Sequence, residues 1–121
     1  MENVSNANKL ESIKSLQSTS TKLENALSQM TQKRANTTLV KKRLNAINIG
    51  LAILENVWTQ RPHHYTKEDL AEARHVLTGL LPSIENSYAK SKAGSPQRTL
   101  LERRIKALEL AIQAIDDLSN T

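Results

Sequence analysis

The chain has 121 residues, of which 38% are hydrophobic, 24% charged and 2% aromatic, and it contains no cysteine. A chain of this length forms one domain and buries most of its apolar surface without covalent cross-links. Three glycines and three prolines among many leucine, alanine, lysine and glutamate residues favour helices over a β-sandwich or barrel. The lack of cysteine excludes a disulfide scaffold, a cysteine-ligated metal site and a thiol enzyme.

Apolar residues that recur three and four positions apart predict four amphipathic helices, because this spacing places side chains on one stripe of a helix. The stripes begin at Leu10, Val40, Leu70 and Leu101. We expect helices at about residues 6–32, 38–59, 67–91 and 96–118.

The breaks between these segments carry helix-end signals. Arg61–Pro62 ends the second helix, because a residue before proline is driven out of the helical conformation. Thr66 is predicted to cap the third helix and Gly94 to end it in a left-handed conformation. Ser95–Pro96 then starts the fourth helix, with serine as the cap and proline in the first helical position.

Pro82 lies inside the third segment, three residues after Gly79, and removes a backbone hydrogen bond, so we expect a kink or a split there. Connections this short make neighbouring helices antiparallel. The expected fold is all-α: an up-down-up-down antiparallel four-helix bundle, formed by a single domain (residues 1–121), with the third helix kinked near Pro82. No internal repeat or linker is apparent.

One Glu-x-x-His pair, Glu72 and His75, has the spacing that di-iron bundles use twice. At about 100° per residue, both side chains project away from the stripe of Leu70 and Leu77, toward solvent. There is no recognisable nucleophile arrangement and no glycine-rich phosphate loop. We therefore expect a protein that is not an enzyme and that uses no metal and no cofactor.

The net charge of +5 is unevenly distributed along the chain. Residues 25–54 hold five cations and no acid, and a second cluster lies between Lys90 and Lys106. In an antiparallel bundle the first and third turns share one end, so both clusters are expected at one basic pole. We predict that this pole binds an anionic partner through Lys33, Arg34, Lys41, Lys42, Arg43, Arg98, Arg103 and Arg104.

The loop after the second helix is a second candidate site, because it gathers Arg61, His63, His64 and Tyr65 on one connection. The sequence offers no stacking aromatics for reading nucleic-acid bases. The expected partner is a protein, and an acidic protein surface is as consistent with the charge as a phosphate surface is. Phosphate-only contact with nucleic acid and contact with an anionic membrane surface remain alternatives.

Ile49, Ile53 and Leu110 lie off the apolar stripes and suggest a homodimer face as a further alternative. The N-terminal residues MENVSNANKLES have neither a basic nor an apolar region typical of a signal peptide, and no apolar run approaches the roughly 20 residues of a membrane span. We expect a cytoplasmic protein.

The stretch WTQRPHHYTKEDL, from Trp58 to Leu70, followed by a helix, resembles the YppE-like family. The shared features are an Arg-Pro turn, an aromatic residue and a Lys-Glu opening of the third helix, and the clear overlap covers residues 54–77. Pro82 and the longer spacing before Tyr88 depart from the family pattern. The resemblance implies a small cytoplasmic four-helix protein of Gram-positive bacteria, and it supplies no catalytic residue, because the biochemical role of that family is not established.

Two functional hypotheses follow. The first is a non-enzymatic interaction or accessory protein that docks an anionic partner through the basic pole. The alternative is a small inhibitor like the helical bacteriocin immunity proteins, which are also small, often basic and cytosolic.

Overall fold

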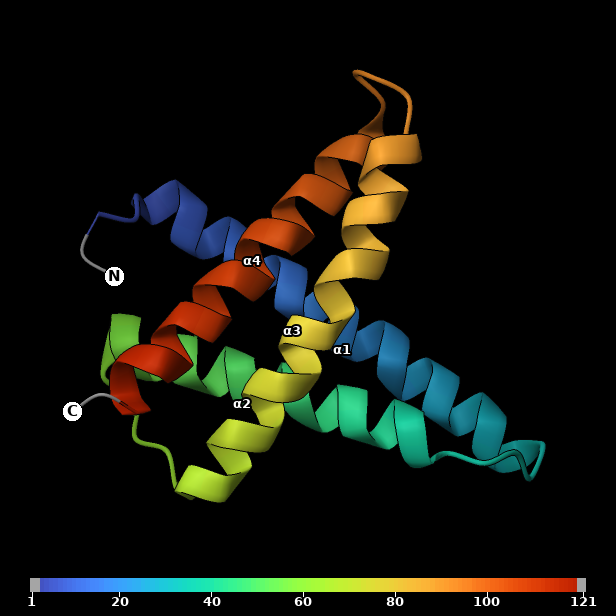
Figure 1. The fold of residues 1–121 in the computed structure, drawn as a ribbon, viewed down its shortest axis with the longest axis horizontal. Helices are drawn as coiled ribbons and strands as arrows, with labels where there is room; N and C mark the ends of the chain where they lie inside the picture. Colours follow the sequence, from blue (N-terminus) through green and yellow to red (C-terminus); the bar gives the residue numbers. More distant parts are fainter. Residues whose placement is uncertain (1–2, 120–121) are drawn as a thin grey trace.

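The computed structural model describes residues 3–119. This part of the chain contains four helices and no strand. The helices form two antiparallel hairpins (Figure 1), and the predicted four-helix bundle is confirmed. Each helix bound agrees with the predicted one to within one residue; the helices are α1 (Asn6–Gln32), α2 (Thr38–Thr59), α3 (Lys67–Lys90) and α4 (Pro96–Ser119).

The helix ends lie where the cap residues place them. The hydroxyl of Thr66 accepts a hydrogen bond from the backbone N–H of Asp69 (3.1 Å), and the Asp69 carboxylate accepts one from the N–H of Thr66 (3.0 Å). This reciprocal pair is a capping box, which satisfies two otherwise unpaired donors. Gly94 adopts a left-handed conformation with φ of 77°, and the Ser95 hydroxyl accepts from the N–H of Arg98 (3.1 Å).

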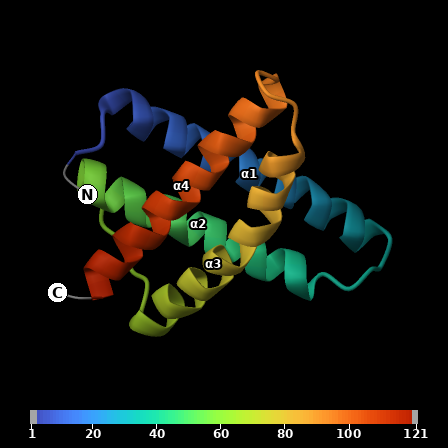
Figure 2. The same cartoon turned by 45° about the horizontal axis from the view of Figure 1, so that its top comes forward.

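Pro82 lies inside α3 without splitting it, because the helix runs continuously from Lys67 to Lys90. Figure 2 shows α3 bending in its middle portion. Proline lacks the N–H for the helical hydrogen bond and its ring crowds the preceding turn, so a bend is the expected response. The predicted kink is confirmed, and the alternative of a split is wrong.

α2 and α4 form the centre of the molecule. They contact each other, and each also contacts both α1 and α3. Within residues 3–119, α1 and α3 do not contact each other. At the crossing of the two central helices a Cβ atom on Gly50 would lie 3.2 Å from the Cβ of Ala111 and 3.3 Å from Cδ1 of Leu77. Small residues at this point let the two helix backbones approach closely.

The residues that lie off the apolar stripes belong to the core. Ile49, Ile53 and Leu110 are 1%, 0% and 5% exposed. Because α2 and α4 each touch three other helices, they bury a wider arc than a single stripe. The inference of a homodimer face from these three residues is therefore wrong.

α4 repeats the burial pattern of α2 at a distance of 61 residues. Every buried residue of α2, in the range Val40–Leu54, has a buried counterpart 61 positions later in α4, in the range Leu101–Ile115. The exposed Leu39 and its counterpart Leu100 are both 59% exposed. The local sequences LVKKRLNAI and LLERRIKAL carry the same pattern.

The two hairpins are related by an approximate two-fold axis. Gly50 and Ala111 are counterparts 61 residues apart, and they lie against each other at the centre of the molecule. Contact between equivalent residues is what a two-fold arrangement produces. The contacts of α1 with α4 likewise have a counterpart in the contacts of α3 with α2. A groove or an exposed side chain on one hairpin is therefore expected at the equivalent position of the other hairpin.

Candidate functional site

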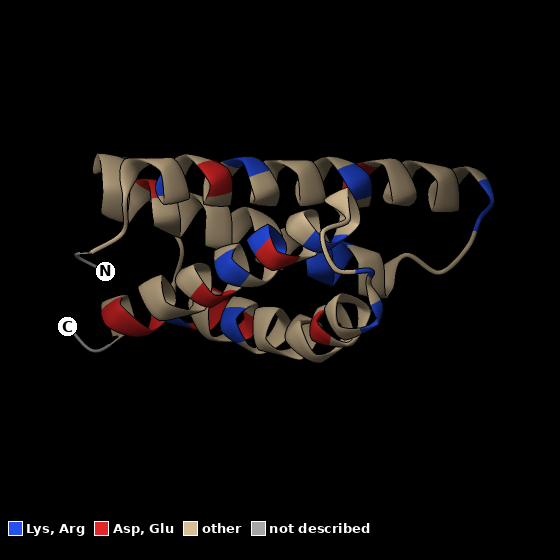
Figure 3. Cartoon of the chain, turned by 90° about the horizontal axis from the view of Figure 1, so that it is seen from above, with Lys and Arg blue, Asp and Glu red and all other residues tan. Residues whose placement is uncertain are grey.

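The predicted single basic pole does not form. The hairpins cross and do not run parallel, so the α1–α2 turn lies at the lower right of Figure 1 and the α3–α4 turn at the top. Figure 3 shows Lys and Arg at the α1–α2 turn and again over the middle of the molecule, where acidic residues lie among them. The prediction of one basic pole assumed that the axes of the two hairpins are parallel. The side chains that meet where α2 and α4 cross set a different angle between them.

The first basic cluster divides into two parts. Lys33 and Arg34 lie exposed at the α1–α2 turn, where Arg34 has a left-handed φ of 57°. Lys41 is exposed on α2. Lys42 and Arg43 instead line a groove between α2 and α3. Only these last two cations lie in a concave surface.

Arg98, in the second cluster, has a structural role. Its guanidinium donates hydrogen bonds to the backbone carbonyls of Ser91 (3.0 Å) and Tyr88 (3.4 Å) and lies 4.2 Å from the centroid of the Tyr88 ring. It thus satisfies carbonyl groups at the end of α3. These contacts hold Arg98 in the α3–α4 turn and leave it less suited to docking than predicted.

Arg103 and Arg104 line a groove between α1 and α4. Arg103 forms an ion pair with Glu11 at 3.6 Å, and both side chains are about half exposed, at 46% and 44%. Such a pair contributes little stability and rearranges easily. The Nε atom of Arg104 is buried and has no hydrogen-bond partner within residues 3–119. A buried donor of this kind favours an acceptor group that enters the groove.

This α1–α4 groove has a volume of about 490 Å³. Two leucines in its lining, Leu10 and Leu100, are 56% and 59% exposed, although Leu10 was expected on the apolar stripe of its helix. The groove combines apolar side chains with cations, serines and one carboxylate; its lining is Ala7, Leu10, Glu11, Lys14, Ser15, Ser18, Leu100, Arg103 and Arg104.

The α2–α3 groove has a volume of about 310 Å³. It also combines an exposed leucine and further apolar side chains with two cations and one carboxylate; its lining is Leu39, Lys42, Arg43, Glu72, His75, Val76, Gly79 and Leu80. Glu72 and His75 are exposed, as their helical positions predicted. Among the residues that the structure describes, no three His, Cys, Asp or Glu side chains gather as metal ligands would.

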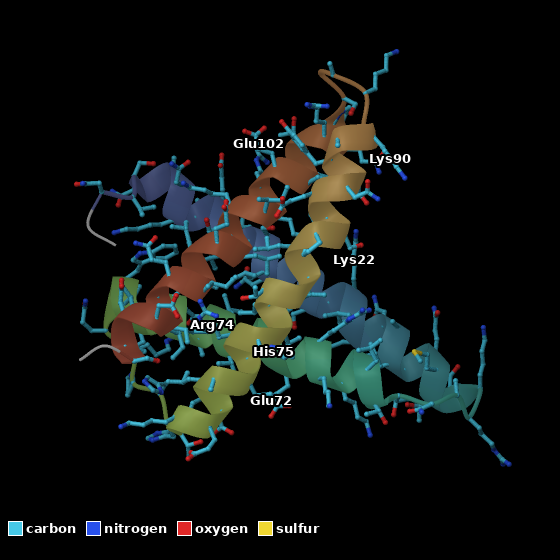
Figure 4. All side chains as sticks on the ribbon, in the orientation of Figure 1. Lys22, Glu72, Arg74, His75, Lys90 and Glu102 are labelled. Carbon is cyan, nitrogen blue, oxygen red and sulfur yellow. The ribbon has the colours of Figure 1, made fainter. Side chains whose placement is uncertain are left out.

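The two grooves are counterparts under the approximate two-fold axis. The lining of the α1–α4 groove comes from the first half of α1 and the first half of α4. In Figure 1 these helix segments lie in the upper part of the molecule. The α2–α3 groove lies toward the lower edge, where Figure 4 labels Glu72 and His75 on α3. Lining residues 61 positions apart correspond; the pairs are Glu11 and Glu72, Lys14 and His75, Ser15 and Val76, Ser18 and Gly79, Leu39 and Leu100, Lys42 and Arg103, and Arg43 and Arg104.

The sequence reasoning missed Leu39, Leu100, Lys14 and Glu11 as site residues. Leu39 and Leu100 are exposed although the next residues, Val40 and Leu101, are buried, because successive side chains of a helix point about 100° apart. The signal that could have found them is the repeated Leu-x-x-[Lys/Arg]-Arg motif at the start of both helices.

The predicted loop site is held together by its own contacts. The Arg61 guanidinium forms an ion pair with Glu55 at 2.6 Å. The rings of His63 and Tyr65 stack with centroids 6.0 Å apart, and Nδ1 of His63 accepts a hydrogen bond from the N–H of Tyr65 (3.2 Å). His64 is exposed. Arg61 thus already has a partner in α2 and His63 has one in the loop, which makes this site weaker than the grooves.

A third hollow, of about 610 Å³, also lies along α4. Its charged lining is mixed in sign, with Glu11, Glu102 and Glu109 beside Arg103 and Lys106. A surface with carboxylates and cations in near balance has no electrostatic preference for an anion.

A bidentate ion pair joins α3 to α4 away from the grooves. Nε and Nη2 of Arg74 donate to the Asp116 carboxylate at 2.5 and 3.3 Å. The hydrogen bond and the charge of Asp116 raise the pKa of Arg74 above its already high usual value. A raised pKa keeps the Arg74 guanidinium charged up to higher pH.

No family model, curated protein or solved structure matches this chain. None of the helices within residues 3–119 is both long enough and apolar enough to cross a membrane.

Proposed function

We propose that this chain is a non-enzymatic docking protein that binds an acidic, amphipathic helical segment of a partner protein. The observation that carries the proposal is the composition of the grooves, each of which combines at least one exposed leucine with at least two cations. Helix recognition in grooves uses apolar anchors on one helix face with charged residues beside them. A segment with leucine-type anchors and flanking carboxylates would complement both features.

A protein segment fits these grooves better than a phosphate surface does. Leu100 and Leu39 would gain free energy only from a partner with apolar side chains. The position of the grooves at opposite edges prevents one flat membrane from reaching both.

The proposal is tested with a fluorescent probe peptide of about 18 residues, or five helical turns. Its leucines recur at helical spacing and its flanks carry glutamate; a control peptide carries lysine in place of each glutamate. Fluorescence anisotropy should report binding of the acidic peptide that weakens as salt rises. The lysine peptide should not bind.

A matched pair of variants locates the binding surface. Lys42→Glu with Arg103→Glu changes one cation in each groove, whereas Lys33→Glu with Arg34→Glu makes the same charge change at the α1–α2 turn. The groove variant should lose at least about ten-fold in affinity, and the turn variant should stay within about two-fold of wild type. Equal losses in both variants would mean that net charge alone drives binding. Tight binding of anionic vesicles or duplex DNA without binding of the acidic peptide would overturn the proposal in favour of a phosphate surface.

A further inference from the structure

We infer that the chain is bivalent: each of its two grooves binds one copy of the same acidic segment, so that one chain joins two partner molecules. This inference rests on the proposed function and adds a second, equivalent binding site to it.

The equivalence of the grooves supports two sites with one specificity. Leu39 and Leu100 occupy equivalent positions and are equally exposed, at 59%. Lys42 corresponds to Arg103. Lys42 follows Leu39 by three positions in α2, and Arg103 follows Leu100 by three positions in α4. A segment whose anchor and carboxylates match one groove therefore finds the same arrangement in the other.

The approximate two-fold axis also decides how the two copies would be placed. It passes between α2 and α4 at Gly50 and Ala111, which lie in the core between the two grooves. The helix segments that line the α1–α4 groove lie in the upper part of Figure 1, and those that line the α2–α3 groove lie in the lower part. Two short segments bound there would lie on opposite sides of the chain and come from separate partner molecules.

Cations outnumber the single carboxylate in each lining, which leaves a net positive charge for an acidic occupant. Glu11 already accepts an ion pair from Arg103 across the α1–α4 groove. A bound acidic segment would compete with Glu11 for that cation, and the half-exposed pair is weak enough to yield. In the α2–α3 groove, Glu72 is the counterpart of Glu11 and Lys42 the counterpart of Arg103.

Titration calorimetry of the full chain with the acidic probe peptide tests the inference directly. Wild type should bind two peptides per chain. Leu39→Glu with Lys42→Glu, and separately Leu100→Glu with Arg103→Glu, should each leave one site with an affinity within about two-fold of wild type and weaken the other at least about ten-fold. The four substitutions together should remove both sites, and Lys33→Glu with Arg34→Glu should keep both.

Circular dichroism checks that each variant stays helical, and the milder alanine substitutions at the same positions replace any variant that unfolds.

A second measurement requires both peptides in one complex. Donor- and acceptor-labelled copies of the probe should show energy transfer when mixed with wild type, and none with either single-groove variant. One peptide per wild-type chain, without energy transfer, would overturn bivalency and leave the proposed function standing. A wild-type chain that binds no acidic peptide would overturn the proposed function itself.

Discussion

Gly50 gives the sharpest test of the crossing on which the two-fold arrangement depends. In the interior of a helix, replacing glycine with alanine stabilises by about 1 kcal/mol through helix propensity. At Gly50 the added Cβ would lie 3.2 Å from the Cβ of Ala111, which is fixed to the backbone of α4. The two helices would have to separate slightly, and overpacking of this kind costs about 1–3 kcal/mol. Gly50→Ala is therefore expected to destabilise the protein by about 1 kcal/mol.

Gly79 provides the matched control. It lies in α3, and a Cβ atom there would have no neighbour within 4 Å. Gly79→Ala should therefore show the full propensity gain and stabilise the protein by about 1 kcal/mol. The same chemical change is expected to have opposite signs at the two positions.

Urea unfolding followed by circular dichroism at 222 nm measures both variants. The two midpoints should differ by about 0.7–2 M, since the difference in free energy of unfolding is about 2 kcal/mol and slopes are about 1–3 kcal/mol per M. Combining Gly50→Ala with Ala111→Gly exchanges the two counterparts and should return stability to within about 0.5 kcal/mol of wild type. A Gly50→Ala variant as stable as Gly79→Ala would refute the close approach of α2 and α4.

Other substitutions test single contacts by the same unfolding assay. Thr66→Ala removes the capping box at the start of α3 and should cost about 1 kcal/mol, and a midpoint equal to wild type would contradict the cap. Leu77→Ala, at a fully buried position, should cost about 3 kcal/mol, whereas Leu100→Ala should change stability by less than about 0.5 kcal/mol; similar costs at the two positions would contradict the burial assigned to them. Arg98→Ala removes the hydrogen bonds to the carbonyls of Tyr88 and Ser91 and should cost about 1 kcal/mol, and it should not affect peptide binding.

Local signals predicted the helix bounds well because they act within a few residues. Thr66 meets its partner three positions along the chain, and Gly94 takes a left-handed φ with no distant contact required. Such interactions leave a clear trace in the sequence. The same holds for Pro82, whose missing N–H bends α3 wherever that helix packs.

The arrangement of the helices depends on contacts between helices, which the apolar stripe of a single helix does not reveal. Ile49 and Ile53 seemed to lie off the core, because the stripes were taken to face one neighbour, whereas α2 faces three helices. The close approach of Gly50 to Ala111 joins residues 61 positions apart, and it permits the crossing that separates the two turns.

Half of the cations that the sequence predicted as binding residues line the two grooves. Lys42, Arg43, Arg103 and Arg104 lie in grooves, whereas the other predicted cations lie at turns, on the exposed face of α2 or in a structural contact. Charge clusters in the sequence locate cations along the chain, but the crossing angle of the hairpins decides which cations share a concave surface. Comparison of α2 with α4, residue by residue, would have disclosed both grooves before the fold was known.

The central claim is that two equivalent grooves bind the same acidic segment, and chemical-shift mapping tests it most directly. Titration of the unlabelled acidic probe into the ¹⁵N-labelled chain should shift amide signals of residues 7–18 and 100–104 together with those of residues 39–43 and 72–80. The turn at Lys33 and Arg34 should stay unchanged. Shifts confined to one groove, or centred on the α1–α2 turn, would contradict the account.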